Sequence, residues 1–197
     1  MSYEIIIQAL WIILPAYIAN ASAVIVGGGT PIDFGKKWKD GKRILGDGKT
    51  WRGLITGAVV GMVGGFGLSI VAIYANDSDF AFLGLSDFGQ FPLMIPMIGA
   101  ICFGALFGDI TESFFKRRIG RDRGEDWIPF DQLDFIIGAL VLSFIVAIII
   151  RIFTSYWFFE NFTIWHMFVL LIITPFFHIF ANFVHRKANR SSRKENI

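Results

Sequence analysis

The stretch GDITESFFKRRIGRDRGEDWIPFDQLD, residues 108–134, lies between two long uncharged stretches and decides how the chain divides into helices. It contains several acidic residues and a basic run, Lys116 to Arg118. Charge within or beside a membrane span is costly, so such side chains indicate a functional site. Carboxylates close to cations at a membrane face suggest a site for a metal ion and a phosphate.

The composition around this stretch is that of an integral membrane protein. Of the 197 residues, 54% are hydrophobic, which is more than a typical soluble domain carries. Segments without Asp, Glu, Lys or Arg are 5–32, 53–76, 88–108, 135–150 and 161–184. A helix of about 20 apolar residues crosses a bilayer. The fourth segment is shorter and is expected to begin near Phe130, which places Asp131 and Asp134 in its first turn.

These segments predict an all-α, polytopic membrane protein that forms one catalytic domain over residues 1–197. Five transmembrane helices are expected at about residues 5–26, 54–75, 91–115, 131–150 and 163–184. The two large loops are then 27–53 and 116–130, and a polar, basic tail follows at 185–197.

The basic residues lie on one side of this arrangement. All but one of the 18 Lys and Arg residues fall in or next to the two large loops and the tail, and Arg151 is the exception. Since basic loops stay in the cytoplasm, the loops and the C-terminus are predicted to be cytoplasmic and the N-terminus outside. We therefore expect a multi-pass protein of the cell membrane, with its active site on the cytoplasmic side.

The first loop, residues 27–53, combines glycines with lysines. Glycine lets the backbone approach a ligand and lysine supplies positive charge, which together suit a polyphosphate. Gly48-Lys49-Thr50 resembles the end of a P-loop, but Arg43 stands where the first P-loop glycine would be, and no strand is expected before it. The loop therefore predicts phosphate binding without a P-loop fold. An ordinary basic loop is the alternative.

The charged stretch is predicted to continue the third helix. Residues three or four apart share one face of a helix, which groups Asp109, Glu112, Ser113 and Lys116. Asp131 and Asp134 are also three apart, at the start of the next helix. Carboxylate oxygens suit Mg²⁺, which takes waters and substrate phosphates as its other ligands. The alternative is ion pairs on a solvated loop, but Asp109 follows a long uncharged run and would be a costly unpaired charge.

Two segments also match family motifs. The pattern G-D-x-x-E-S-x-x-K-R occupies residues 108–117, and Pro129 and D-x-x-D at residues 131–134 follow. Upstream, residues 48–53 are similar to the motif P-K-K-T-x-E-G. This combination resembles the phosphatidate cytidylyltransferases, or CDP-diacylglycerol synthases. The short chain and the runs TPID and GDGKTWRG look most like the archaeal branch of that family, the CDP-archaeol synthases.

The resemblance implies a CTP-dependent cytidylyltransferase with Mg²⁺ as its cofactor. An isoprenoid glycerol-phosphate lipid, 2,3-bis-O-geranylgeranyl-glycerol phosphate, attacks the α-phosphorus of CTP, pyrophosphate leaves, and a CDP-lipid forms. The expected metal ligands are Asp109, Asp131 and Asp134. Lys116 and Arg117 are expected to hold the lipid phosphate or the triphosphate. The expected CTP-binding residues are Gly48, Lys49, Thr50 and Arg52, with Glu112 and Ser113 in supporting positions.

The expected partners are therefore CTP, the lipid phosphate and the bilayer, with no nucleic acid, and the oligomeric state stays open. A CTP-dependent isoprenoid-alcohol kinase is an alternative, which would yield CDP and a phosphorylated lipid. A small transporter is another, although it predicts charge through several spans, and here the apolar segments hold almost none beyond Asp109 and Glu112. A non-catalytic scaffold for anionic lipid would explain the basic loops but not the paired aspartates.

Overall fold

The computed structural model describes residues 3–121, 125, 127 and 129–176. Within these residues the chain is helical, with two isolated β-bridges in the first loop and no strand. The helices are α1 Tyr3–Ile25, α2 Trp51–Asn76, the short 3-10 helix η1 Ala81–Leu83, α3 Gln90–Arg118, α4 Phe130–Phe153 and a further apolar helix, Ile164–Phe176.

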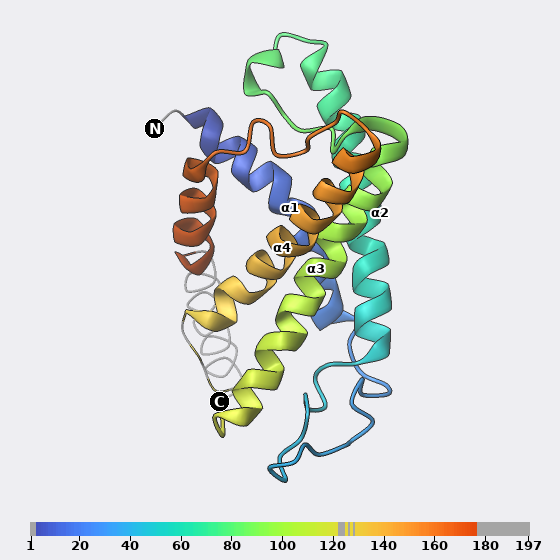
Figure 1. Ribbon diagram of the computed structural model, residues 1–197, viewed down its shortest axis with the longest axis vertical. Helices are drawn as coiled ribbons and strands as arrows, with labels where there is room; N and C mark the ends of the chain where they lie inside the picture. The colour runs from blue at the N-terminus through green and yellow to red at the C-terminus, as the bar shows by residue number, and fades with distance from the viewer. Residues whose placement is uncertain (1–2, 122–124, 126, 128, 177–197) are drawn as a thin grey trace, which may run out of the picture.

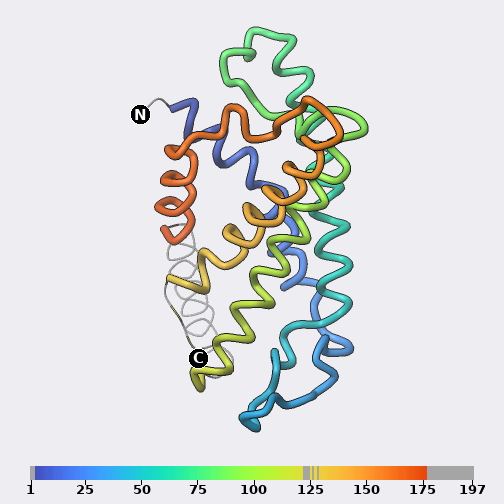
Figure 2. The backbone as a smooth tube through the Cα atoms, viewed as in Figure 1, coloured from blue at the N-terminus to red at the C-terminus, as the bar shows by residue number. Residues whose placement is uncertain are grey.

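The long helices run between the two ends of an elongated molecule (Figure 1). The loop of residues 26–50 and the C-terminal end of α3 lie at one end, and the loops 77–89 and 154–163 lie at the other. The tube in Figure 2 shows α4 tilted across α3, and these two helices share the most extensive helix contact in the described residues. The helices α1 to α4 are each long and apolar enough to cross a membrane.

The helix boundaries follow the charge pattern of the sequence. α3 continues past Asp109 to Arg118, and α4 begins at Phe130, as predicted. Of the predicted fifth span, 163–184, the structure describes a helix over Ile164–Phe176, and the remainder of that span lies outside the described residues. An all-helical fold with several apolar, membrane-length helices is therefore confirmed.

Small residues bring α2 against α1. Gly57 and Gly61 of α2 face Ala19 of α1, and a Cβ atom at Gly57 would lie 2.8 Å from the carbonyl oxygen of Ala19. Such spacing of glycines lets two helix backbones approach closely in a membrane. The Gly57-x-x-x-Gly61 pattern therefore serves packing within the chain.

A second contact between small residues joins α3 to α4. A Cβ atom at Gly104 would lie 2.5 Å from the carbonyl oxygen of Gly138, and one at Gly108 would overlap the backbone of Asp134. The two backbones can meet this closely only because these glycines carry no side chain. The crossing thereby brings the acidic turn of α3 beside the first turns of α4.

Candidate active site

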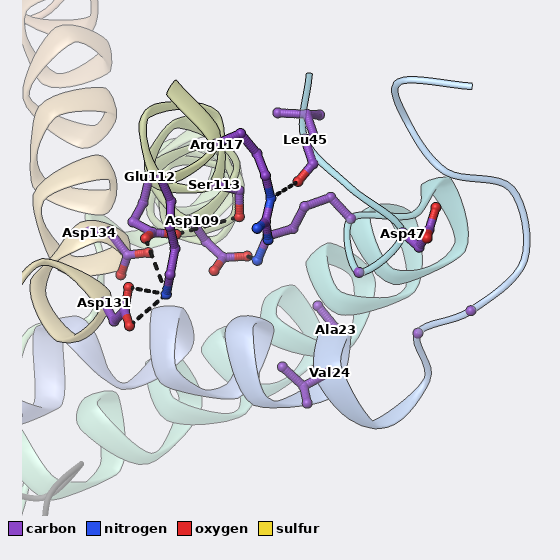
Figure 3. A pocket seen from close by; sticks show the side chains of 15 residues that line it. Ala23, Val24, Leu45, Asp47, Asp109, Glu112, Ser113, Arg117, Asp131 and Asp134 are labelled. Carbon is purple, nitrogen blue, oxygen red and sulfur yellow. Dashed lines mark hydrogen bonds and ion pairs between the residues drawn. The ribbon is translucent and has the colours of Figure 1, made fainter. Parts of the chain in front are cut away.

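A cavity of about 570 Å³ lies at the end of the molecule that carries the first loop. Figure 3 shows the side chains that line it. We call it the polar cavity. Its walls are the end of α1, the loop from Gly27 to Lys49, the last turns of α3 and the first turns of α4. The charged stretch and the glycine–lysine loop, which are far apart in the sequence, therefore face one shared space.

Four predicted carboxylates line the polar cavity: Asp109, Glu112, Asp131 and Asp134. Lys49 Nζ donates a hydrogen bond to Asp109 Oδ2 at 2.5 Å. Lys116 Nζ donates to both carboxylate oxygens of Asp131 at 2.8 Å. Each lysine offsets the negative charge of one carboxylate. The Lys49–Asp109 pair joins the first loop to α3, and the Lys116–Asp131 pair joins α3 to α4.

The carboxylate of Glu112 has weaker partners than those of Asp109 and Asp131. Its side chain is 8% exposed, and Oε1 lies 3.8 Å from Lys116 Nζ and accepts no hydrogen bond from any described residue. Its Oε2 lies 3.5 Å from the hydroxyl of the buried Ser113. A buried oxygen without a donor is costly. A cation or a donor group bound beside Glu112 would therefore be stabilised.

The lining of the polar cavity is more negative than positive. Asp47 adds a fifth carboxylate to the four above, and the cations in the lining are Lys49, Lys116 and Arg117. Like charges brought together at low dielectric repel each other strongly. A phosphate can bind beside these carboxylates only when a further cation offsets their charge.

The carboxylates of the polar cavity fit a hard divalent cation. Mg²⁺ prefers oxygen ligands and commonly takes only one or two carboxylates, with waters and substrate phosphates as the rest. Among the described residues, no three Asp, Glu, His or Cys side chains converge closely enough to hold a metal by themselves. This arrangement, with the uncompensated oxygen of Glu112, suits a cation that binds together with a phosphate.

The first loop is shaped by a buried carboxylate that the sequence analysis did not single out. Asp33 accepts hydrogen bonds from the N–H groups of Leu45 and Gly46 at 3.0 and 3.1 Å. It accepts another from Gly35 N–H at 3.0 Å and ion-pairs with Arg43 at 2.8 Å. Burial alone would raise the pKa of Asp33, but these donors outweigh it and hold the pKa below its usual range. An aspartate two residues before a glycine is the turn signal that could have revealed this role.

The predicted CTP-binding residues divide into two pairs. Gly48 and Lys49 line the polar cavity. Thr50 is 3% exposed and caps α2, where its hydroxyl accepts a hydrogen bond from a first-turn N–H group at 3.1 Å. The guanidinium of Arg52 donates to two backbone carbonyls that follow α1. Thr50 and Arg52 therefore hold the walls in place, and their side chains lie outside the lining of this cavity.

Arg117 reaches from α3 toward the first loop (Figure 3). Its Nε donates to the carbonyl oxygen of Leu45 at 3.3 Å, and its Nη1 donates to that of Arg121 at 2.5 Å. Carbonyl oxygens orient the guanidinium without neutralising its charge. The two predicted phosphate-binding residues of α3 therefore differ in direction. Arg117 extends from the last turn of α3 to the first loop, whereas Lys116 points to Asp131 and Glu112.

An apolar groove of about 660 Å³ lies beside the polar cavity, between α3 and α4. Its lining is mostly aromatic and aliphatic, and includes Phe107, Phe115 and Ile137. Glu112 and Asp134 line both spaces. A ligand with a phosphate head and apolar tails could therefore place each part in a matching environment. The glycine crossing that forms this boundary was not predicted from the sequence, although the Gly104-x-x-x-Gly108 spacing signals it.

Comparison with known proteins agrees with the motif resemblance. The profile of the CarS-like CDP-archaeol synthase family matches residues 2–192. The CDP-archaeol synthase of Methanosarcina barkeri is 42% identical over 174 residues, which are 87% of this chain and 93% of that protein. The CDP-archaeol synthase of Thermococcus onnurineus is 41% identical over 183 residues, which are 93% of each chain.

A solved structure, described as an intramembrane enzyme for archaeal membrane lipids biosynthesis, has the same fold. It is 34% identical, with a TM-score of 0.70 over 90% of this chain and 94% of that chain. The family resemblance drawn from the two motifs is thus confirmed over nearly the whole sequence. The chain belongs to the CDP-archaeol synthase family, and it is a multi-pass membrane cytidylyltransferase of archaeal lipid biosynthesis.

Proposed function

We propose that this protein transfers the cytidylyl group of CTP to an isoprenoid ether-lipid phosphate, in one catalytic domain formed by the whole chain. Pyrophosphate is released, and CDP-archaeol remains in the membrane. One observation carries the proposal: Glu112 and Asp134 line both the polar cavity and the apolar groove. A water-soluble nucleotide and a membrane lipid can react only where such spaces meet.

The side chains of this site are proposed to position two phosphates. An oxygen of the lipid phosphate forms a bond to the α-phosphorus of CTP, and the bond from that phosphorus to the bridging oxygen of the β-phosphate breaks. Gly48 and Lys49 would hold the phosphates of CTP, and Lys116 and Arg117 the lipid phosphate or the triphosphate, because all four line the cavity. The attacking phosphate is already ionised, so no catalytic base is needed.

Asp109, Asp131 and Asp134 are the proposed ligands of Mg²⁺, of which one or two would bind the ion directly while waters and phosphate oxygens supply its other ligands. When bound, this ion offsets the charge of the phosphate oxygens, and its two positive charges would offset the excess of carboxylates over cations in the cavity lining. Glu112 and Ser113 would orient the bound groups, since Glu112 contributes a buried oxygen, Oε1, and the hydroxyl of Ser113 lies 3.5 Å from its other oxygen, Oε2.

The lipid tails are proposed to stay in the apolar groove between α3 and α4. Its lining presents Phe107, Phe115 and Ile137 to a ligand, together with the glycines of the helix crossing. Flexible isoprenoid chains need an apolar surface and few polar contacts. The head of the lipid would then reach the carboxylates without leaving the bilayer.

The active site is proposed to face the cytoplasm, with the N-terminus outside, a fifth span over residues 163–184 and the C-terminus inside. The cavity lies at the same end of the molecule as the first loop and the basic end of α3 (Figure 1). Basic segments of membrane proteins stay in the cytoplasm.

Product analysis tests the proposed reaction. The purified protein with CTP, Mg²⁺ and digeranylgeranylglyceryl phosphate should release pyrophosphate and form a CDP-lipid, detected by mass spectrometry. Removal of divalent cations by EDTA should stop the reaction, and added Mg²⁺ should restore it. Formation of CDP and a further phosphorylated lipid would instead identify a kinase.

Two substitutions test the metal ligands. Asp109→Asn and Asp131→Asn should each lower turnover by about 10³-fold, because each removes a charge that the transition state requires. Asp79→Asn, an exposed aspartate at the opposite end of the molecule, is the matched control and should behave as the wild type. Normal turnover in both site variants would contradict the metal assignment.

A further inference from the structure

A second cavity, of about 380 Å³, adjoins the polar cavity and shares Asp47 and Arg117 with it. We call it the basic cavity. Its charged lining residues are Lys42, Arg43, Arg117 and Arg121, with Asp47 as the carboxylate. The predicted metal ligands do not line it. Its charge balance is therefore positive, the reverse of that in the polar cavity.

The cations of the basic cavity differ in the groups that hold them, which are carboxylates for one and carbonyl oxygens for two others. Arg43 is compensated, because it ion-pairs with Asp33 and with Asp47, each at 2.8 Å. Arg117 donates to carbonyl oxygens only in the contacts given above, and Lys42 Nζ donates to the carbonyl oxygen of Arg118 at 3.3 Å. Carbonyl groups hold these two cations in position and leave their charge for an anion.

Two glycines with positive φ let the cations approach the backbone. A Cβ atom at Gly46, where φ is +99°, would lie 3.4 Å from Arg117 Nε. A Cβ atom at Gly120, where φ is +84°, would lie 3.2 Å from Lys42 Nζ. Gly120 also ends α3, because its N–H and that of Arg121 bond back to the last turn of the helix. The turn thus brings Arg121 back toward the cavity.

We propose that the basic cavity is a diphosphate site, which holds the β- and γ-phosphates of CTP before transfer and inorganic pyrophosphate after it. This inference rests on the proposed function. The α-phosphate would lie in the polar cavity, and the rest of the triphosphate would pass Arg117, which lines both spaces. A diphosphate offers many oxygen acceptors and several negative charges, which guanidinium and ammonium groups match.

The chemistry of the transfer fits this placement. When the bond between the α-phosphorus and the bridging oxygen breaks, its electron pair stays on the departing pyrophosphate. Negative charge therefore grows on the β-phosphate, where fixed cations stabilise it most effectively. A lipid phosphate has the same oxygen chemistry, but the basic cavity shares no lining residue with the apolar groove. The diphosphate is therefore the favoured ligand.

Lys42 and Arg121 provide the test, because they line the basic cavity and not the polar cavity. In Lys42→Gln and Arg121→Gln, the inhibition constant of pyrophosphate and the KM for CTP should each rise about tenfold, as expected for loss of one charge-assisted contact. The KM for the lipid phosphate should stay the same. Lys42→Arg should retain most of the affinity for pyrophosphate. Lys39→Gln, an exposed lysine of the same loop that lines neither cavity, is the matched control.

Direct binding separates the possible outcomes. Inorganic pyrophosphate, titrated calorimetrically into the wild type without lipid, should bind, and the Gln variants should bind it about tenfold more weakly. Unchanged pyrophosphate affinity overturns the inference, and so does a rise in the KM for lipid phosphate alone, which would place the lipid head here. If the wild type forms no CDP-lipid, the proposed function fails, while this titration still reports on the cavity.

Discussion

Asp33 organises the first loop from outside the lining of the polar cavity. Its carboxylate gathers three backbone N–H groups and the guanidinium of Arg43 around one buried point. The loop is rich in lysine, and its positive charges repel one another. A central negative charge offsets that repulsion, so the position of Lys49 at the cavity depends on Asp33.

Replacing Asp33 should loosen this loop. Asp33→Asn keeps the size of the side chain but removes its charge, and should cost about 1.5–3 kcal/mol, the range for hydrogen bonds to a charged group. Thermal unfolding in detergent should therefore show a lower Tm than in the wild type at neutral pH. Asp47→Asn removes an exposed partner of the same arginine and should change Tm little.

The pH dependence of this difference follows from the lowered pKa of Asp33. The folded pKa lies below the unfolded value of about 3.9, so the stabilisation is complete above that pH and is lost as the pH falls through the folded pKa. The gap in Tm between the wild type and Asp33→Asn should thus narrow below about pH 4. A gap that widened with acidification would contradict the role of the charge.

The site could be predicted from sequence at some residues and not at others. Asp109 could be identified because a charge after a long apolar run is costly, and helix spacing placed Glu112 and Lys116 on the same face. In the structure these three side chains line one cavity. Arg52 lies in the first turn of α2, and the direction of its side chain depends on hydrogen bonds to the carbonyls that follow α1, a segment distant in the sequence. No local pattern shows those bonds in advance.

At the level of elements, the α3–α4 crossing determines the site. Gly104, Gly108 and Gly138 allow the backbones to touch, and the acidic residues of both helices lie within the next turns. A site built on two packed helices is held more precisely than one built on loops. The distance between Lys116 and Asp131 is set by this contact.

Adding one methyl group at the crossing should disturb the site. In Gly104→Ala, Cβ would lie 2.5 Å from the carbonyl oxygen of Gly138, so α3 and α4 must separate. A displacement approaching 1 Å can lower turnover by about 10²-fold, and Tm should fall as well. Turnover and Tm would be measured together on the purified variant.

Gly99→Ala is the matched control for this substitution. It lies in the same helix, but its Cβ would be 3.8 Å from Met62 Cε, an ordinary contact. It should keep wild-type turnover and Tm. Equal effects of the two alanines would argue against the crossing as the element that positions the site.

The elements were largely predictable from charge, because each uncharged run must satisfy its backbone hydrogen bonds as a helix. The ends depend on local chemistry: α2 begins at Trp51 since Thr50 caps it, and α3 ends at Arg118 since Gly120 follows. The uncharged segments do not indicate which helices cross each other or at which residues. Several pairs of small residues were available, and only the packed fold selects between them.

For the whole molecule, the uneven distribution of basic residues gives a testable orientation. Lys39→Cys in the first loop and Asp79→Cys at the opposite end place one exposed thiol at each end of the molecule. The single native cysteine, Cys102, is fully buried and should not react. In intact spheroplasts, a membrane-impermeant maleimide should label Asp79→Cys, and should label Lys39→Cys only after permeabilisation. The reverse pattern would place the cavity outside.

The wall that the polar cavity shares with the apolar groove also determines which concentration of each substrate sets the rate. CTP arrives from a volume of water, whereas a lipid held in the groove arrives from an area of membrane. The rate should therefore follow the mole fraction of lipid phosphate in the bilayer. Dilution of the bilayer with inert lipid would lower the turnover rate of each enzyme molecule, even if the total amount of lipid substrate in the sample were unchanged. Adding water at constant CTP concentration would leave that rate as it was.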